Sequence, residues 1–176
     1  VDIADEEGML IFEEIPVYWD INFKNMETSR LAHNMIKDLI NRDINHPSVI
    51  VWSVGNENPT EVLSTKRNLR SLMQYARRLD DTRLVVYVSN RYGGDILRRE
   101  SDLNCQNGYF GWYALTVYQW NFFCDIFYET APKKPLIITE FGAGAKIGIN
   151  DPDIKFSEKN QARIISYIIK VLNSKP

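Results

Sequence analysis

The sequence predicts an α/β fold, and more narrowly a partial (β/α)8 barrel. Short apolar segments alternate with longer amphipathic ones, as strands alternate with helices in a parallel sheet. Polar side chains stand at the ends of several expected strands, namely Glu14, Asn56, Glu57, Asn107 and Glu140. Functional groups at the carboxyl ends of several strands are typical of a barrel, whereas the Gly-rich first turn of a dinucleotide-binding sheet is missing. The barrel is therefore the better prediction.

The expected strands are short and apolar. They cover residues 9–12, 49–54, 84–88, 102–107 and 136–139. The run at 49–54 is almost continuously apolar, which is typical of a parallel strand buried on both faces. Pro16 limits the first strand, because proline cannot donate a hydrogen bond to a neighbouring strand.

The expected helices lie between and after these strands. They cover residues 28–43, 61–79, 118–130 and 157–172. Leu31, Met35 and Leu39 have the spacing of a helix with one buried face. Ser157 is the expected N-cap of the last helix. The first residues resemble the end of another helix, which Gly8 would stop.

The predicted barrel is incomplete. A full (β/α)8 barrel takes roughly 250 residues and eight strands, whereas this pattern yields five strands, about the third to the seventh. We therefore expect residues 1–176 to be a segment of one barrel domain in a larger protein.

Composition excludes several classes of protein. The chain is 44% hydrophobic and 25% charged, as in globular proteins, and its net charge of −2 favours neither nucleic acid nor an anionic membrane as partner. No apolar run reaches the ~18 residues of a membrane span. Cys105 and Cys124 form no CxxC motif, so a disulfide framework or a zinc site is not expected.

The two glutamates that end long apolar strands, Glu57 and Glu140, suggest glycosidic bond hydrolysis. A retaining glycosidase needs two carboxyl groups about 5–5.5 Å apart, one protonated and one ionised. At an effective dielectric near 20 two such charges repel by about 3 kcal/mol, which raises the pKa of one of them by about two units. From the residues alone, a structural role as helix cap or arginine partner stays equally open for both.

Three segments resemble glycoside hydrolase family 2. Residues 46–57, HPSVIVWSVGNE, resemble its acid/base motif, residues 135–142, PLIITEFG, resemble its nucleophile strand, and residues 5–16 resemble its third strand. The segments occur in the family's order and the resemblance covers nearly the whole chain. It implies that Glu57 is the proton donor, that Glu140 is the nucleophile, and that Asn56 hydrogen-bonds the sugar 2-hydroxyl. This chemistry needs no metal and no cofactor.

Residues 107–113, NGYFGWY, resemble a segment of the β-glucuronidases in this family. The resemblance implies that Asn107 and Tyr109 belong to the substrate site, with Tyr109 beside the nucleophile. It also implies that Tyr113 lies near the substrate carboxylate. The alternative is that these aromatic side chains pack beneath a loop, a role that we expect for Trp112.

The expected function is that of a retaining exo-β-glycosidase, most similar to β-glucuronidase, with a β-glycoside as its partner. Two alternatives stay open. The third-strand and acid/base motifs are shared with β-galactosidases and β-mannosidases of the same family. The second alternative is that the chain is an inactive barrel fragment or a carbohydrate-binding remnant. A homo-oligomer of the full-length protein also stays open.

Overall fold

The structure, a computed structural model, describes residues 1–175. The chain forms two compact units. The first comprises Val1–Cys105 together with Lys134–Ile137, and the second comprises Gln106–Lys133 together with the residues from Ile138 onward. Strands β4 and β5 each contribute residues to both units.

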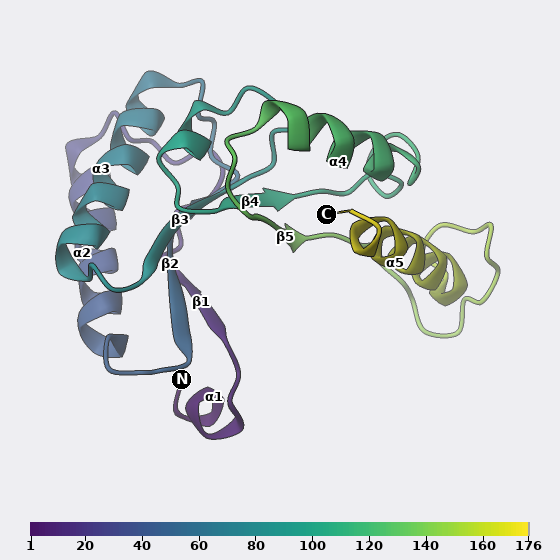
Figure 1. Cartoon of the computed structure of the whole chain (residues 1–176), viewed down its shortest axis with the longest axis horizontal. Coiled ribbons are helices and arrows are strands. Elements are labelled where there is room, and N and C mark those ends of the chain that lie inside the picture. The colour runs from purple at the N-terminus through teal and green to yellow at the C-terminus, as the bar shows by residue number, and fades with distance from the viewer. Residues whose placement is uncertain (176) are drawn as a thin grey trace. The chain divides into compact units, whose positions relative to one another are not determined.

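Helices and strands alternate along the chain (Figure 1). They are α1 (Asp2–Glu7), β1 (Ile11–Glu14), α2 (Met26–Asp43), β2 (Val49–Asn56), α3 (Leu63–Leu79), β3 (Leu84–Ser89), the 3-10 helix η1 (Ile96–Arg99), β4 (Asn104–Asn107), α4 (Gln119–Thr130), β5 (Leu136–Glu140) and α5 (Glu158–Asn173). The strands are hydrogen-bonded in the order β1-β2-β3-β4-β5, and β1, β2 and β3 pair in parallel. Sequential parallel pairing confirms the α/β class and the partial (β/α)8 barrel.

Two strands begin later than predicted, and β2, β3 and β5 begin as predicted but extend one or two residues further. Strand β1 begins two residues later than expected, because its pairing starts where Ile11 N donates to Ser48 O at 2.8 Å and Ile11 faces Val49. Met9 precedes the pairing and is exposed. Strand β4 also begins late, at Asn104. The sequence reading missed η1, a single short turn without a helical repeat of apolar residues.

One apolar core of the first unit lies between strands β1–β3 and helices α2 and α3, which lie side by side in Figure 1. Its buried members are Ile15, Val17, Phe23, Ala32, Ile36, Ile40, Val49, Trp52, Val54, Leu69, Leu72, Met73, Ala76, Val85, Tyr87 and Leu97. Burial of one such aliphatic side chain contributes about 1.5–3 kcal/mol. The sequence pattern predicts Val62 in the buried stripe of α3, and this prediction is wrong, because Val62 is the N-cap residue and is exposed.

A second cluster of the first unit combines alternate residues of β2 and β3, since successive side chains of a strand point to opposite faces, with one residue just before β4 and one within it. It comprises Val51, Val86, Val88, Leu103 and Cys105. Burial raises the pKa of the Cys105 thiol to about 12. This cysteine is thus a small buried apolar residue, as expected.

The second unit has its own core, formed mainly by α4 and α5. Its buried members are Phe110, Trp120, Phe123, Cys124, Phe127, Ile164, Ile168 and Val171. The rings of Phe110 and Trp120 meet edge to face with centroids 5.5 Å apart, a favourable aromatic geometry. Ser157 Oγ accepts a hydrogen bond from Asn160 N at 3.0 Å, which confirms Ser157 as the N-cap of α5.

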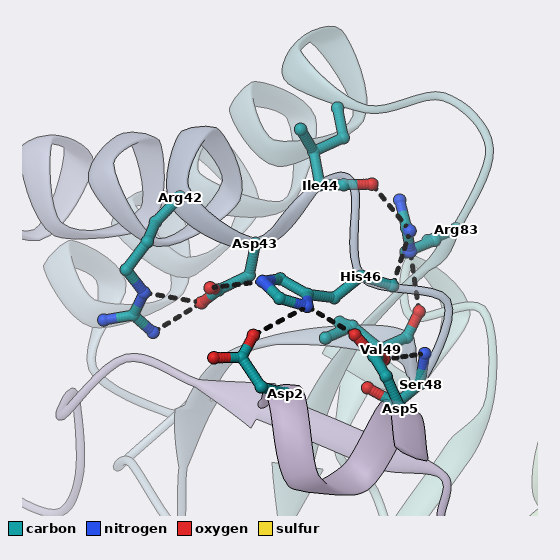
Figure 2. Close-up of polar contacts among 9 residues, drawn as sticks. All are labelled: Asp2, Asp5, Arg42, Asp43, Ile44, His46, Ser48, Val49 and Arg83. Carbon is teal, nitrogen blue, oxygen red and sulfur yellow. Dashed lines mark hydrogen bonds and ion pairs between the residues drawn. The ribbon is translucent and has the colours of Figure 1, made fainter. Parts of the chain in front are cut away.

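A polar network joins α1 to the start of β2 (Figure 2). His46 Nδ1 lies 2.5 Å from Asp5 Oδ2, and Ser48 N donates to Asp5 Oδ1 at 2.9 Å. The hydrogen bonds from Ser48 and His46 lower the pKa of Asp5 to about 2. Arg83 completes the network, because its guanidinium donates to Val49 O at 2.6 Å and to Ile44 O at 2.8 Å. The network fixes the chain where it enters β2.

Within residues 1–175, none of the helices combines the length and the hydropathy that crossing a bilayer would require.

Candidate active site

Three strand ends of the first unit meet around Asn56 and Glu57. Asn56 N donates to Val17 O at 2.9 Å, just beyond β1, and Glu57 N donates to Val88 O at 2.9 Å, near the end of β3. Glu57 has a φ of 55°, which is uncommon for a residue other than glycine. Such a conformation costs roughly 1–3 kcal/mol and persists only where surrounding contacts enforce it. The backbone of Asn56 and Glu57 is thus held by both neighbouring strand ends.

Gly55 and Asn58 form a tightly packed support beneath Glu57. A Cβ on Gly55 would lie 2.6 Å from Asn58 Oδ1 and 3.1 Å from Val17 O, so only glycine fits. Asn58 is fully buried, and its carbonyl accepts a hydrogen bond from Tyr87 Oη at 3.0 Å. Burial, and then the charge of Asp95, raises the pKa of Tyr87 well above its usual value. Tyr87 therefore stays a hydrogen-bond donor at any ordinary pH.

Trp19 contacts the side chain of Glu57. Its indole Nε1 donates to Glu57 Oε2 at 3.2 Å across 38 residues of sequence. The sequence reading missed Trp19. The available signal was a pair of aromatic residues, Tyr18 and Trp19, in the loop that follows an expected strand and Pro16.

Glu14 ends β1 and belongs to the same unit. Its Oε2 accepts a hydrogen bond from Ser53 Oγ on β2 at 2.6 Å. The contact links the two strands and gives Glu14 a supporting role.

In the second unit, Glu140 is the last residue of β5. Tyr109 Oη donates to Glu140 Oε2 at 2.6 Å, and Gly108 N donates to Glu140 O at 2.9 Å. A Cβ on Gly108 would lie 2.5 Å from Trp120 in the core, so glycine is required there too. The segment after β4 therefore holds both the backbone and the carboxyl group of Glu140.

The remaining sequence-predicted residues also lie in the second unit. Asn107 is buried, and its Oδ1 accepts a hydrogen bond from Thr139 Oγ1 at 2.6 Å. Tyr113 is 75% exposed, and its ring centroid lies 5.2 Å from that of Tyr109. Trp112 is buried, with its ring centroid 4.9 Å from that of Phe156, and thus has the packing role expected of it.

One group of described residues has the geometry to hold a metal ion. Ligand atoms of Asp2, Asp5 and His46 lie within 4.8 Å of one another. The group precedes β2, whereas Glu57 follows it, and eight strand residues span roughly 26 Å. Asp5 already accepts hydrogen bonds from His46 and Ser48 (Figure 2). The Asp2 side chain is 90% exposed. We therefore assign these three residues to the polar network that joins α1 to β2 and not to a metal site.

Curated proteins similar to the chain include β-glucuronidases. That of Mus musculus is 31% identical over 185 residues, covering 99% of this chain and 28% of the mouse protein. That of Paenibacillus borealis is 32% identical, covering 94% of this chain and 31% of the bacterial protein. The chain thus spans about a third of the length of these relatives.

Solved structures show the same similarity. The β-D-glucuronidase of Dictyoglomus thermophilum superposes with a TM-score of 0.87 at 32% identity, covering 97% of this chain and 33% of that one. A β-galacturonidase of Eisenbergiella tayi, bound to galacturonate, superposes with a TM-score of 0.89 at 26% identity, covering 99% of this chain and 32% of that one.

The family described as "Glycosyl hydrolases family 2, TIM barrel domain" matches residues 1–174. This match covers almost the whole chain and agrees with the parallel strands β1–β3. The chain therefore belongs to glycosyl hydrolase family 2 and represents part of its TIM barrel domain.

Proposed function

We propose that the protein carrying this chain is a retaining exo-β-glucuronidase and that residues 1–176 are a segment of its single catalytic barrel. The observation that carries the proposal is the hydrogen bond from Tyr109 Oη to Glu140 Oε2. It joins the segment that resembles β-glucuronidases to the expected nucleophile. Membership of family 2 and the similarity to named β-glucuronidases support it.

In the proposed reaction Glu140 attacks the anomeric carbon while Glu57 gives its proton to the departing glycosidic oxygen. The bond between that carbon and oxygen breaks, and a covalent glycosyl-enzyme forms. Glu57, now ionised, then takes a proton from water as the water attacks the same carbon. The ester to Glu140 breaks, and sugar with retained configuration leaves.

The other sequence-predicted residues have supporting roles in this proposal. The Tyr109 hydroxyl fixes the rotation of the Glu140 carboxylate, because a short charge-assisted hydrogen bond is strong and directional. Asn56 donates to the 2-hydroxyl of the sugar, a contact that strengthens in the transition state. Asn107 holds the end of β4 against β5 through Thr139. The exposed ring of Tyr113 contacts the uronic acid end of the substrate.

A second candidate substrate is a β-galacturonide. The similar protein of Eisenbergiella tayi is described as a β-galacturonidase bound to galacturonate. Glucuronate and galacturonate differ only in configuration at C4 and carry the same carboxylate. Both substrates therefore fit the residues that we assign to a uronic acid.

The test compares kcat/KM of the protein that carries this chain for four 4-nitrophenyl β-glycosides. We expect the glucuronide to exceed the galactoside and the mannoside by at least about a hundredfold, since a site built for a charged group rejects its neutral analogue. Preference for the galacturonide would assign the second candidate instead. Preference for the galactoside or mannoside would contradict both. The isolated 176-residue chain is assayed in parallel, because absence of turnover by it alone is what the inactive-fragment alternative predicts.

A further inference from the structure

Trp19 combines two features that packing does not explain. The residue is 62% exposed, so it contributes little to the core. Its φ is 54°, a conformation that a bulky residue adopts only where its surroundings enforce it. An exposed and strained tryptophan points to a role other than stability.

The loop holds Trp19 on several sides. Its backbone N–H donates to Asn56 O at 3.1 Å, and its carbonyl accepts from Asn58 Nδ2 at 2.9 Å. The ring of Tyr18 meets the Trp19 ring edge to face, with centroids 5.4 Å apart and planes at 90°. Asn56 and Asn58 flank Glu57, so the same short segment orients both Trp19 and the carboxyl group that Trp19 contacts.

We infer that Trp19 is a positioning residue for Glu57, through the hydrogen bond from indole Nε1 to Oε2. The inference rests on the acid/base role proposed for Glu57. An indole N–H is a donor only. The carbonyl oxygen of a carboxylic acid is a better acceptor than its hydroxyl oxygen, so in the acid form of Glu57 the contact favours the proton on Oε1.

This assignment specifies which oxygen does the chemistry. Oε1 delivers its proton to the departing glycosidic oxygen, and the same atom takes a proton from water in the second step. Oε2 stays on the indole throughout, so the carboxyl group does not turn between the two steps. Substrates whose leaving group is a weak acid, such as phenyl or alkyl glycosides, depend on this alignment, whereas strongly activated aryl glycosides leave without a proton.

The experiment uses the protein that carries this chain and compares Trp19→Phe with Tyr18→Phe. Trp19→Phe keeps an aromatic ring and removes the N–H. The control Tyr18→Phe keeps the edge-to-face ring and removes only a hydroxyl. The readout is kcat/KM for phenyl β-glucuronide and for 2,4-dinitrophenyl β-glucuronide, because this ratio reports the first, leaving-group-dependent step.

General acid catalysis contributes about 10²–10⁴-fold, and loss of alignment removes a part of it. We expect Trp19→Phe to lower kcat/KM for the phenyl substrate about tenfold or more and that for the dinitrophenyl substrate less than about threefold. Tyr18→Phe should leave both within about twofold. Equal losses on the two substrates, or no loss on the phenyl substrate, would overturn the inference.

A spectroscopic measurement tests the contact itself. In ¹H–¹⁵N spectra the indole signal of Trp19, assigned by its absence in Trp19→Phe, should move upfield in Glu57→Ala. An unchanged signal would overturn the inference.

The wild-type assay separates the two proposals. Wild-type protein without activity on any glycoside contradicts the proposed function and the role of Trp19 with it. Active wild-type protein with equal losses contradicts the role of Trp19 alone.

Discussion

Tyr109 and Glu140 are joined by a hydrogen bond of 2.6 Å between Oη and Oε2. Tyr109 follows β4 by two residues and Glu140 ends β5, so the contact links the carboxyl ends of neighbouring strands. The bond from Gly108 N to Glu140 O, at 2.9 Å, fixes the same two segments through their backbones. The carboxyl group of Glu140 is thus oriented by Tyr109, and the neighbour of Tyr109, Gly108, is bonded to the backbone of Glu140.

This contact predicts the effect of Tyr109→Phe in the protein that carries the chain. A hydrogen bond to a charged group contributes about 1.5–3 kcal/mol, so kcat/KM for the preferred substrate should fall by about ten- to a hundredfold. Steady-state kinetics measure the change. Tyr128→Phe is the control, since Tyr128 is exposed on α4 and packs against Lys133, and it should leave kcat/KM unchanged. Equal values for Tyr109→Phe and wild type would contradict the role given to Tyr109.

Gly55 predicts a stability effect. In Gly55→Ala the added Cβ would lie 2.6 Å from Asn58 Oδ1, 2.9 Å from Leu69 Cδ2 and 3.1 Å from a backbone carbonyl. Overpacking of this kind costs about 1–3 kcal/mol, and the free energy of unfolding should fall by that amount in a urea titration. The control is Gly93→Ala, since a Cβ there meets nothing within 4 Å, and it should change stability by less than about 0.5 kcal/mol. A similar loss in both variants would show that the site below Glu57 is not tightly packed.

Asp5 predicts a dependence of stability on pH. Its pKa is lowered from 3.8 to about 2 by hydrogen bonds from Ser48 and His46, so the unfolded chain binds a proton at Asp5 more readily than the folded one. The contribution of Asp5 is therefore fully present above about pH 4 and is lost as the pH falls towards 2. Asp5→Asn should be less stable than wild type at pH 6 and should lose less of its stability between pH 4 and 2, as measured by chemical denaturation at each pH.

The matched control for Asp5 is Asp2→Asn. The Asp2 side chain is 90% exposed and its oxygen lies 3.8 Å from His46 Nδ1. Asp2→Asn therefore removes only an exposed ion pair, which contributes little to stability. Its pH profile should follow that of wild type. If Asp5→Asn also followed the wild-type profile, the hydrogen bonds of Asp5 would not be the cause of the pH dependence.

Much of the fold could be predicted from the sequence because it is expressed in local patterns. The apolar run at 49–54 and the helical spacing of Leu69, Leu72 and Met73 report burial directly. Ser157 could be recognised as an N-cap because a cap acts on residues three positions away. The positions of Glu57 and Glu140 at strand ends could be predicted because each lies within a few residues of the end of such an apolar run.

Contacts between distant segments could not be predicted in this way. Pairing with Ser48 and Val49 decides where β1 begins, and nothing near Ile11 in the sequence records it. The bond from Trp19 to Glu57 spans 38 residues and depends on an unusual backbone conformation at both ends. Local patterns carry no information on either feature.

The central claim is that Glu140 is the nucleophile of a retaining β-glycosidase. The most direct test treats the protein that carries this chain with a 2-deoxy-2-fluoro glucuronosyl fluoride, which forms a glycosyl-enzyme that hydrolyses slowly. Digestion with trypsin then yields residues 134–146, a peptide in which Glu140 is the only Asp or Glu side chain. The matched control is Glu140→Gln, which should not be labelled.

We expect the mass of one fluoroglycosyl group on this peptide in the wild-type protein and no adduct in Glu140→Gln. An adduct on any other carboxylate, or none in a protein that turns over the corresponding glycoside, would contradict the assignment.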